Sequence, residues 1–292
     1  MPGAEIIEGT LAAADGTRLF TRAANLRAPR ANVILTHGLG EHSARYLHVA
    51  DYFAAQGFRL CAYDLRGHGR SDGTRGELKN YDDFLRDLEC VLDHFSVAEV
   101  PSFLYGHSLG GQITLNFLSR EKRNIAGAVI SSPWLRLAFT PNRFKVLLAK
   151  IALRFWPQFT QNKPANVHFL SRDQEFLNSM SDRDLIHHRV SARMFAEISR
   201  GATEALAAAP HFQWPLFLIH GDNDSITSHL ATREFFDAAS SPDKKLLFLP
   251  GHLHELHNEL GRDAVLAEIT RWIAQRVSGQ PIAGYAISSQ SP

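Results

Sequence analysis

Six short apolar runs recur along the chain, and each ends in turn residues. They lie at residues 32–38, 59–67, 102–108, 127–133, 216–222 and 245–251. Near-continuous apolar strands of this kind belong to sheets that are covered on both faces, which in practice are parallel sheets. The runs therefore predict six buried strands of one parallel sheet.

Segments of helical period separate these strands. Residues 81–95 and 109–120 have such a pattern, and the last segment places Val265, Ile269, Trp272, Ile273 and Val277 on one helical face. Strands that alternate with helices predict an α/β fold with a mostly parallel, doubly wound sheet. The first 30 residues differ, because Asp15-Gly16 reads as the turn of an antiparallel hairpin.

Residues 133–210 interrupt the alternation, since we find helical patterns there and no convincing strand. We interpret this stretch as a helical cap inserted into the core. The predicted division is a first core part at 1–132, the cap at 133–210, a second core part at 211–278, and a disordered tail at 279–292.

Composition places the chain among ordinary globular proteins and excludes few functions. It has 292 residues, 45% hydrophobic and 21% charged, and a formal net charge of +1. A chain that is not basic as a whole is not expected to bind nucleic acid. The N-terminus lacks the apolar segment of a signal peptide, and no stretch is apolar enough to span a membrane, so the expected location is cytoplasmic.

The stretch "LYGHSLGGQ" (104–112) places Ser108 between two glycines, directly after an apolar run. The pattern G-x-S-x-G between a strand and a helix is the nucleophile elbow of an α/β-hydrolase. The tight turn exposes the serine hydroxyl, and small neighbours let the following helix pass close to the strand. The setting therefore predicts that Ser108 is a catalytic nucleophile.

A serine nucleophile needs a base, and the base needs an acid that orients it. In this fold the acid and then the histidine follow the serine along the chain. Asp222 and Asp224 follow the run at 216–222. Three histidines, His252, His254 and His257, follow the last strand. The order holds, but position alone leaves the choice within each group open.

Five separated motifs then make a specific resemblance. They are "THGLGEHSARY" (36–46), "DLRGHGRSDG" (64–73), "GHSLGG" (106–111), "HGDND" (220–224) and "PGHLHELHNE" (250–259). Together they resemble the monoacylglycerol lipase and lysophospholipase branch of the α/β-hydrolases, over about residues 15–277. The resemblance implies a triad of Ser108, Asp224 and His254, with Asp222 and His252 as loop neighbours.

Acyl transfer also requires donors for the oxyanion of the tetrahedral intermediate. One is expected to be the backbone N–H of Leu109, the residue after the nucleophile. The "HGLG" turn resembles the H-G-x-G turn of the family and implies Leu39 N–H as the second donor. His37 is expected to hold that loop and take no part in the chemistry.

We expect no cofactor and no metal. The histidines of "HELH" (254–257) are three residues apart, unlike those of H-E-x-x-H, and "DNDSIT" lacks the glycine and glutamate of a calcium loop. The glycine-rich stretches lack the lysine of a phosphate-binding loop.

The cap suggests a lipid substrate. Residues 122–172 hold nine Lys or Arg and no Asp or Glu. The same stretch contains apolar side chains that are spaced to share one face of a helix: Phe144, Leu148, Ile151, Phe155 and Trp156. A basic amphipathic helix can lie on an anionic membrane surface. The alternative is a lid that packs on the core and carries solvated cations.

The first hypothesis is thus a serine carboxylesterase that hydrolyses monoacylglycerols through an acyl-enzyme, with possible peripheral membrane contact. A lysophospholipase or a broad-specificity esterase of the same fold is the alternative. From another class, a non-catalytic binding protein could keep this fold, although such proteins should have lost a member of the triad.

Overall fold

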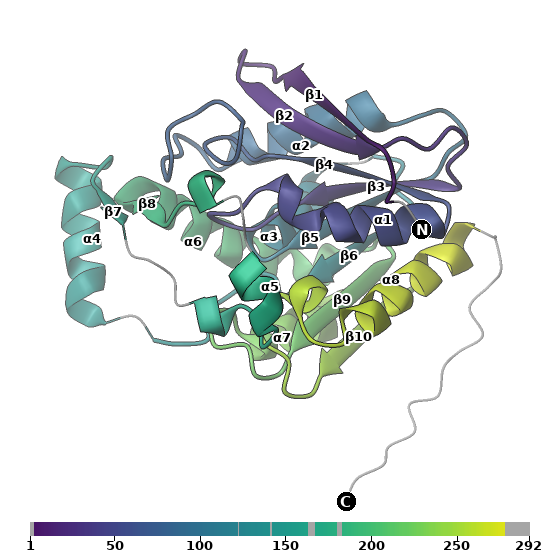
Figure 1. Ribbon diagram of the computed structural model, residues 1–292. Coiled ribbons are helices and arrows are strands. Elements are labelled where there is room, and N and C mark those ends of the chain that lie inside the picture. Colours follow the sequence, from purple (N-terminus) through teal and green to yellow (C-terminus); the bar gives the residue numbers. More distant parts are fainter. Residues whose placement is uncertain (1–2, 122, 141, 163–166, 180–182, 278–292) are drawn as a thin grey trace, which may run out of the picture.

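The computed structural model describes residues 3–277 except 122, 141, 163–166 and 180–182; the predicted tail at 279–292 lies outside these residues. One eight-stranded sheet forms the centre, in the order β1-β2-β4-β3-β5-β6-β9-β10 (Figure 1). The six predicted strands are all present: β3 (Ala31–Thr36), β4 (Phe58–Tyr63), β5 (Ser102–His107), β6 (Gly127–Ser131), β9 (Leu216–Gly221) and β10 (Lys244–Leu249). They run parallel to one another, as the apolar pattern predicts.

The N-terminal hairpin is also confirmed. Strands β1 (Ile6–Ala12) and β2 (Arg18–Ala24) pair antiparallel, and β2 joins β4 antiparallel at one side of the sheet. Gly16 has a φ of +84° in the turn between them, a conformation that glycine adopts without the penalty of a Cβ.

Both faces are covered at the interior strands β3, β5, β6 and β9, which explains why these strands are buried along their whole length. Neighbouring residues on a strand point to opposite faces, so Ile34 packs with one hydrophobic cluster while Val33 and Leu35 pack with the other. The first cluster includes side chains of α2 (Asp82–Phe95), α3 (Leu109–Arg120) and α7 (His229–Ala238). The second includes α1 (Leu47–Ala55) and α8 (Arg262–Val277). These layers hold the carboxyl ends of β5, β9 and β10 in fixed relative positions.

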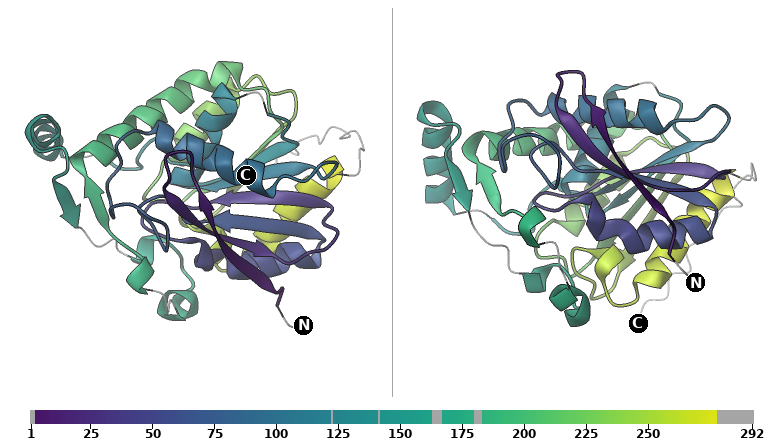
Figure 2. Two further views of the ribbon diagram at one scale, coloured as in Figure 1. Left: turned by 90° about the horizontal axis from the view of Figure 1, so that it is seen from above. Right: turned by 45° about the horizontal axis from the view of Figure 1, so that its top comes forward.

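The segment between β6 and β9 is mostly helical. It contains α4 (Arg143–Phe155), α5 (Gln174–Ser179) and α6 (Ala192–Ala208), with short 3-10 turns at Val167–Phe169, Arg183–Leu185 and Ala209–His211. Helix α6 packs against α3 of the core. Helix α4 stands at the outer edge of this segment, away from the sheet, in both views of Figure 2.

The expectation that this segment holds no strand is wrong. Strands β7 (Thr160–Asn162) and β8 (Arg189–Ser191) pair antiparallel in a separate two-stranded sheet. Three-residue strands are too short to show the alternation that marks a strand in sequence. Their pairing joins residues about 30 positions apart, and a local sequence pattern cannot predict such a pairing. The division of the chain at 132/133 and 210/211 stays a prediction.

Candidate active site

Ser108 occupies the turn between β5 and α3, in a strained backbone conformation. Its φ is +53° and its ψ is −115°, a region that non-glycine residues rarely adopt. Three backbone hydrogen bonds hold it there: its N–H donates to Ser131 O at 3.0 Å, and its carbonyl accepts from Gln112 N–H at 3.1 Å and Trp134 N–H at 3.0 Å. The surrounding backbone thus fixes the serine at the carboxyl end of the central strand.

The flanking glycines are required by close backbone contacts. A Cβ on Gly110 would lie 2.0 Å from the carbonyl oxygen of Thr36, and one on Gly106 would lie 2.5 Å from the carbonyl oxygen of Gly110. Either distance is far below van der Waals contact. Helix α3 therefore passes over the ends of β3 and β5 only because these positions have no side chain.

Asp224 and His254 meet at the same edge of the sheet, although 30 residues separate them. Asp224 follows β9 and His254 follows β10, and His254 Nδ1 lies 2.6 Å from Asp224 Oδ2. Both are buried. With the Nδ1 proton donated to the carboxylate, Nε2 is the ring nitrogen left to take up a proton.

Both oxygens of the Asp224 carboxylate accept further hydrogen bonds. Oδ1 accepts from the N–H groups of Ile226 (2.8 Å) and Thr227 (3.1 Å), while Oδ2 accepts from the Thr227 hydroxyl (2.9 Å) and lies 3.0 Å from His220 Nε2. Burial alone would raise the pKa of this carboxyl, but His254 and these hydrogen bonds outweigh it and hold the pKa well below its usual range. Asp224 is therefore ionised at neutral pH.

The pKa of His254 is shifted in the opposite direction from the pKa values of its neighbours His107 and His220. Burial disfavours the protonated form of His254, but the Asp224 carboxylate more than compensates, so the pKa of His254 is raised above its ordinary value. Burial, reinforced by the neighbouring His254, lowers the pKa of His107 to about 3. Burial also lowers the pKa of His220, against the opposing effect of Asp224. Of these three, only His254 favours the charged form.

Asp222 and His252, the neighbours that position alone left open, make local contacts. Asp222 Oδ1 accepts from Gly251 N–H at 2.6 Å, and His252 Nδ1 lies 3.0 Å from the carbonyl oxygen of Pro250. Both contacts hold the β10 turn in shape. The structure thus gives both residues contacts within these loops.

The turn that follows β3 lies beside the serine. A Cβ on Gly38 would lie 3.1 Å from Ser108 Cβ, so the peptide between Gly38 and Leu39 is next to the nucleophile position. His37 Nδ1 is 2.8 Å from the Gly38 carbonyl oxygen, and its Nε2 accepts from Leu65 N–H at 3.0 Å. Since Nε2 accepts, Nδ1 carries the proton and donates to Gly38. The N–H of a trans peptide points away from its C=O, so this bond also sets the direction of Leu39 N–H.

Leu109 N–H is the other expected donor, and it belongs to the first residue of α3. The first N–H groups of a helix have no partner within the helix and carry the positive end of its dipole. Ser108 is thus bordered by two backbone N–H groups from different segments, at Leu39 and Leu109.

Several residues that support this arrangement escaped the analysis of the sequence. His220 and Thr227 brace Asp224, and three charged residues, Glu41, Arg45 and Glu255, lie behind the site in ion pairs. His220 lies four residues before Asp224, but without the fold that spacing has no meaning. Glu255 and Arg45 are 210 positions apart, so no local pattern connects them.

The five cap side chains named from the sequence do not pack into the core. The exposed fractions are 79% for Phe144, 62% for Leu148, 47% for Ile151, 77% for Phe155 and 65% for Trp156. The expected basic character is also weaker than the sequence suggests, because three of the nine cations pair with carboxylates from elsewhere. Arg123 pairs with Glu89 and Asp93, Arg136 with Glu234, and Arg172 with Glu259.

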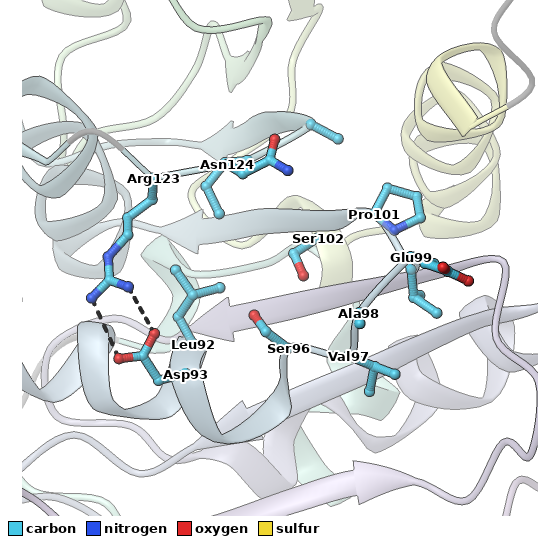
Figure 3. Close-up of a pocket in the computed structure, with 13 residues that line it drawn as sticks. Leu92, Asp93, Ser96, Val97, Ala98, Glu99, Pro101, Ser102, Arg123 and Asn124 are labelled. Atoms are coloured by element: carbon cyan, nitrogen blue, oxygen red, sulfur yellow. Dashed lines mark hydrogen bonds and ion pairs between the residues drawn. The ribbon is translucent and has the colours of Figure 1, made fainter.

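A cavity of about 510 Å³ lies at the other end of the sheet (Figure 3). Residues before β5 and before β6 line it, including Glu99, Pro101 and Asn124, and Arg123 and Asp93 form an ion pair across its rim. Ligands of open α/β sheets bind outside the carboxyl ends of the strands, and this cavity is at the amino ends. We do not assign it to the active site.

Among residues 3–277, apart from the gaps given above, no three His, Cys, Asp or Glu side chains gather in a way that could hold a metal ion. Within the same part of the chain, no helix has the length and apolar character needed to cross a membrane.

A serine at a strained turn after the central strand, followed along the chain by an acid and a histidine at later strand ends, defines an α/β-hydrolase. The family model described as serine aminopeptidase, S33, matches residues 27–261. The chain belongs to this family of serine hydrolases.

Individual relatives agree with this assignment. The chain is 31% identical to the monoacylglycerol lipase of Mycolicibacterium smegmatis, covering 85% of this chain and 90% of that protein. It is 33% identical over 251 residues to an uncharacterised abhydrolase domain-containing protein of Dictyostelium discoideum, but spans only 27% of that longer chain. The crystal structure of Paleococcus ferrophilus monoacylglycerol lipase superposes with a TM-score of 0.79 at 26% identity, over 93% of this chain and 99% of that one.

Proposed function

We propose that this enzyme hydrolyses monoacylglycerols to fatty acid and glycerol, with Ser108 as nucleophile, His254 as base and Asp224 as the orienting acid. The observation that carries the proposal is the 2.6 Å contact between His254 Nδ1 and Asp224 Oδ2, at the sheet edge where Ser108 occupies its strained turn. Relatives named as monoacylglycerol lipases support the choice of substrate.

The reaction follows from these groups. Ser108 Oγ attacks the ester carbonyl while His254 Nε2 takes its proton, and the Leu39 and Leu109 N–H groups donate to the oxyanion. His254 then gives the proton to the departing glycerol oxygen, which leaves an acyl group on Ser108. A water molecule, deprotonated by the same nitrogen, releases the fatty acid. Asp224 stays ionised and stabilises the imidazolium in both halves of the cycle.

The first experiment measures fatty-acid release from a long-chain monoacylglycerol and from the lysophosphatidylcholine with the same acyl chain. We expect preference for the glyceride, and a loss of about 10⁴-fold or more in Ser108→Ala and His254→Ala. His252→Ala is the matched control, because it removes a histidine from the same loop, and it should retain activity.

Each other outcome changes the conclusion. Preference for the phospholipid keeps the mechanism and makes the enzyme a lysophospholipase. Cleavage of neither lipid directs the search to smaller esters or amides. If an active-site phosphonate fails to label Ser108, the enzyme role itself is contradicted, and a binding protein that keeps the fold is the better description.

We also propose that the exposed face of α4 contacts the lipid surface from which the substrate is taken. Phe144, Leu148, Ile151 and Phe155 are spaced along one helical face, and all four are exposed. Exposed apolar side chains gathered on one face are unusual in a soluble protein and mark an interaction surface. A monoacyl lipid resides in membranes or micelles, so contact with such a surface would bring α4 and its substrate together.

A further inference from the structure

A buried guanidinium lies between the two loops that carry the proposed oxyanion donor and the proposed base. Arg45 Nη2 is 2.5 Å from Glu255 Oε2, and its Nη1 is 3.6 Å from Glu41 Oε2. The exposed fractions of the three side chains are only 8% for Arg45, 3% for Glu255 and 5% for Glu41. One cation thus joins two carboxylates that lie more than 200 positions apart in the chain.

On one side, Glu41 holds the turn after β3. Its Oε1 accepts from Gly38 N–H at 2.5 Å and from the Tyr46 hydroxyl at 2.9 Å. The Gly38 N–H and the Leu39 N–H belong to consecutive peptide groups. A movement of the Glu41 carboxylate therefore changes the direction of the proposed oxyanion donor.

On the other side, Glu255 directly follows His254. Its Oε2 also accepts from Asn258 Nδ2 at 2.8 Å, and its backbone N–H donates to the carbonyl oxygen of Leu170 at 2.8 Å. The side chain and the backbone of Glu255 are both held, so the backbone that carries His254 has little freedom. Arg45 further lies 5.6 Å above the ring of Phe176 in α5.

We propose that Arg45 is a positioning residue, which keeps the Leu39 loop and the His254 loop in the relative placement that catalysis needs. This inference rests on the proposed roles of Leu39 and His254. A misplacement of about 1 Å of a reacting group can lower a rate about 100-fold, so a single buried contact between two catalytic loops is sufficient to matter.

A purely structural ion pair would also cost stability when broken, because it would leave buried charges without a partner. The test must therefore distinguish a loss of folding stability from a loss of catalytic rate. Arg276 provides a matched control: its side chain is 9% exposed, it pairs with Asp243, and it lies 3.7 Å above the Trp272 ring. That pair is near the start of β10, at the opposite end of the sheet from His254.

The experiment compares Arg45→Met with Arg276→Met on a water-soluble ester, with Ser108→Ala alongside. We expect both Met variants to lose stability, but only Arg45→Met to lose kcat, by about 10- to 100-fold with KM within about threefold. If Arg45→Met does not fold, Arg45→Lys replaces it, since a lysine keeps the charge but lacks the fork that reaches both carboxylates.

The pH profile gives a second readout, because a charge that lies beside His254 shifts its pKa, whereas a remote structural ion pair such as Arg276 with Asp243 does not. The charged and titratable groups that act on the His254 imidazole are Asp224, Glu255, Glu41, His107, His220 and His257, with Arg45 beside Glu255. Glu255→Gln removes a negative charge, so the acidic limb of kcat/KM should move to lower pH. Arg45→Met removes a positive charge, so the limb should move to higher pH.

Equal kcat in Arg45→Met and Arg276→Met, or two pH shifts of the same sign, would overturn the positioning role. Full activity in Ser108→Ala would instead contradict the proposed function, and the premise for Arg45 with it. Loss of activity in Ser108→Ala together with an unaffected Arg45→Met contradicts the positioning role alone.

Discussion

The carboxylate of Asp224 is a buried charge that the surrounding hydrogen-bond donors stabilise. Donors from Ile226, Thr227, His220 and His254 converge on it, and together they offset the cost of burial. The stabilised charge in turn favours the protonated form of His254. This is the balance that a general base requires, because the imidazolium must form during the reaction and then release its proton.

The pH dependence of the reaction should report this balance. His254 accepts a proton only when neutral, and its pKa lies above the ordinary 6.5. We therefore expect kcat/KM to rise with pH through a midpoint above 6.5. Asp224→Asn removes the charge, so the midpoint should move to lower pH while kcat falls by about 10⁴-fold.

Initial rates on a soluble ester from pH 5 to 9 would check both expectations. Asp222→Asn is the control, since that carboxylate contacts only the Gly251 turn among the hydrogen bonds given above. A wild-type midpoint below 6.5, or one that Asp224→Asn leaves in place, would contradict the pairing of His254 with Asp224.

At the scale of single elements, α4 differs from the other long helices. Helices α3 and α8 bury their apolar face against the sheet, whereas α4 presents Phe144, Leu148 and Phe155 to solvent. Figure 1 places it at the outer edge of the molecule. An amphipathic helix that exposes apolar side chains can bury them in a lipid interface.

We therefore expect Phe144→Asp and Phe155→Asp to weaken binding to vesicles. Each substitution puts a charge where an apolar ring would enter the interface, and the double variant should bind at least about tenfold less well by cosedimentation. Leu230→Asp is a matched control, because Leu230 is 65% exposed and lies on α7, a different helix from α4. Binding of the double variant equal to that of Leu230→Asp would contradict the proposed lipid contact.

At the scale of the whole molecule, the insertion is tied to both catalytic loops. Ser171 Oγ donates to the Asn258 carbonyl at 2.7 Å, and Arg172 N–H donates to Glu259 Oε1 at 3.0 Å, both on the loop that follows His254. On the other side, His187 N–H donates to the Gly40 carbonyl at 3.0 Å, next to Leu39. The segment between β6 and β9 is thus part of the framework of the site.

A substitution of Glu259 tests this framework most directly. Glu259 is fully buried, and its carboxylate accepts from the N–H groups of Arg172, Leu253 and Leu260. Glu259→Ala leaves these donors without a partner, so we expect the free energy of unfolding to fall by about 1–3 kcal/mol or more. We also expect a lower kcat, because Leu253 immediately precedes His254.

Urea unfolding and kcat should be measured together for this variant. Glu268→Ala is the control, because Glu268 pairs with Lys245 and Arg271 at the surface and exposed pairs contribute about 0–1 kcal/mol. A Glu259→Ala protein as stable and active as Glu268→Ala would show that the insertion is not coupled to the His254 loop.

Much of this protein can be predicted from its sequence, because the relevant physics is local. A parallel strand that is covered on both faces must be apolar at most positions, and the six predicted strands correspond to such near-continuous apolar runs. The elbow glycines are equally local, since a turn this tight has no room for a Cβ at Gly106 or Gly110. The chain order of Ser108, Asp224 and His254 is a property of the sequence as well.

Other features depend on contacts between distant segments, and only the tertiary structure decided them. The three-residue strands β7 and β8 have too few residues for a pattern, and they exist because their pairing satisfies backbone groups across the insertion. In the sequence, Arg123, Arg136 and Arg172 suggest a positively charged surface. In the folded chain, each of them forms an ion pair with a carboxylate. Arg45 and Glu255 have no relation in sequence. They follow β3 and β10, which three other strands separate in the sheet, and only the folding of the two loops over its carboxyl edge brings them together. Burial and partnership are properties of the folded chain, and they determine which charged residues serve the site.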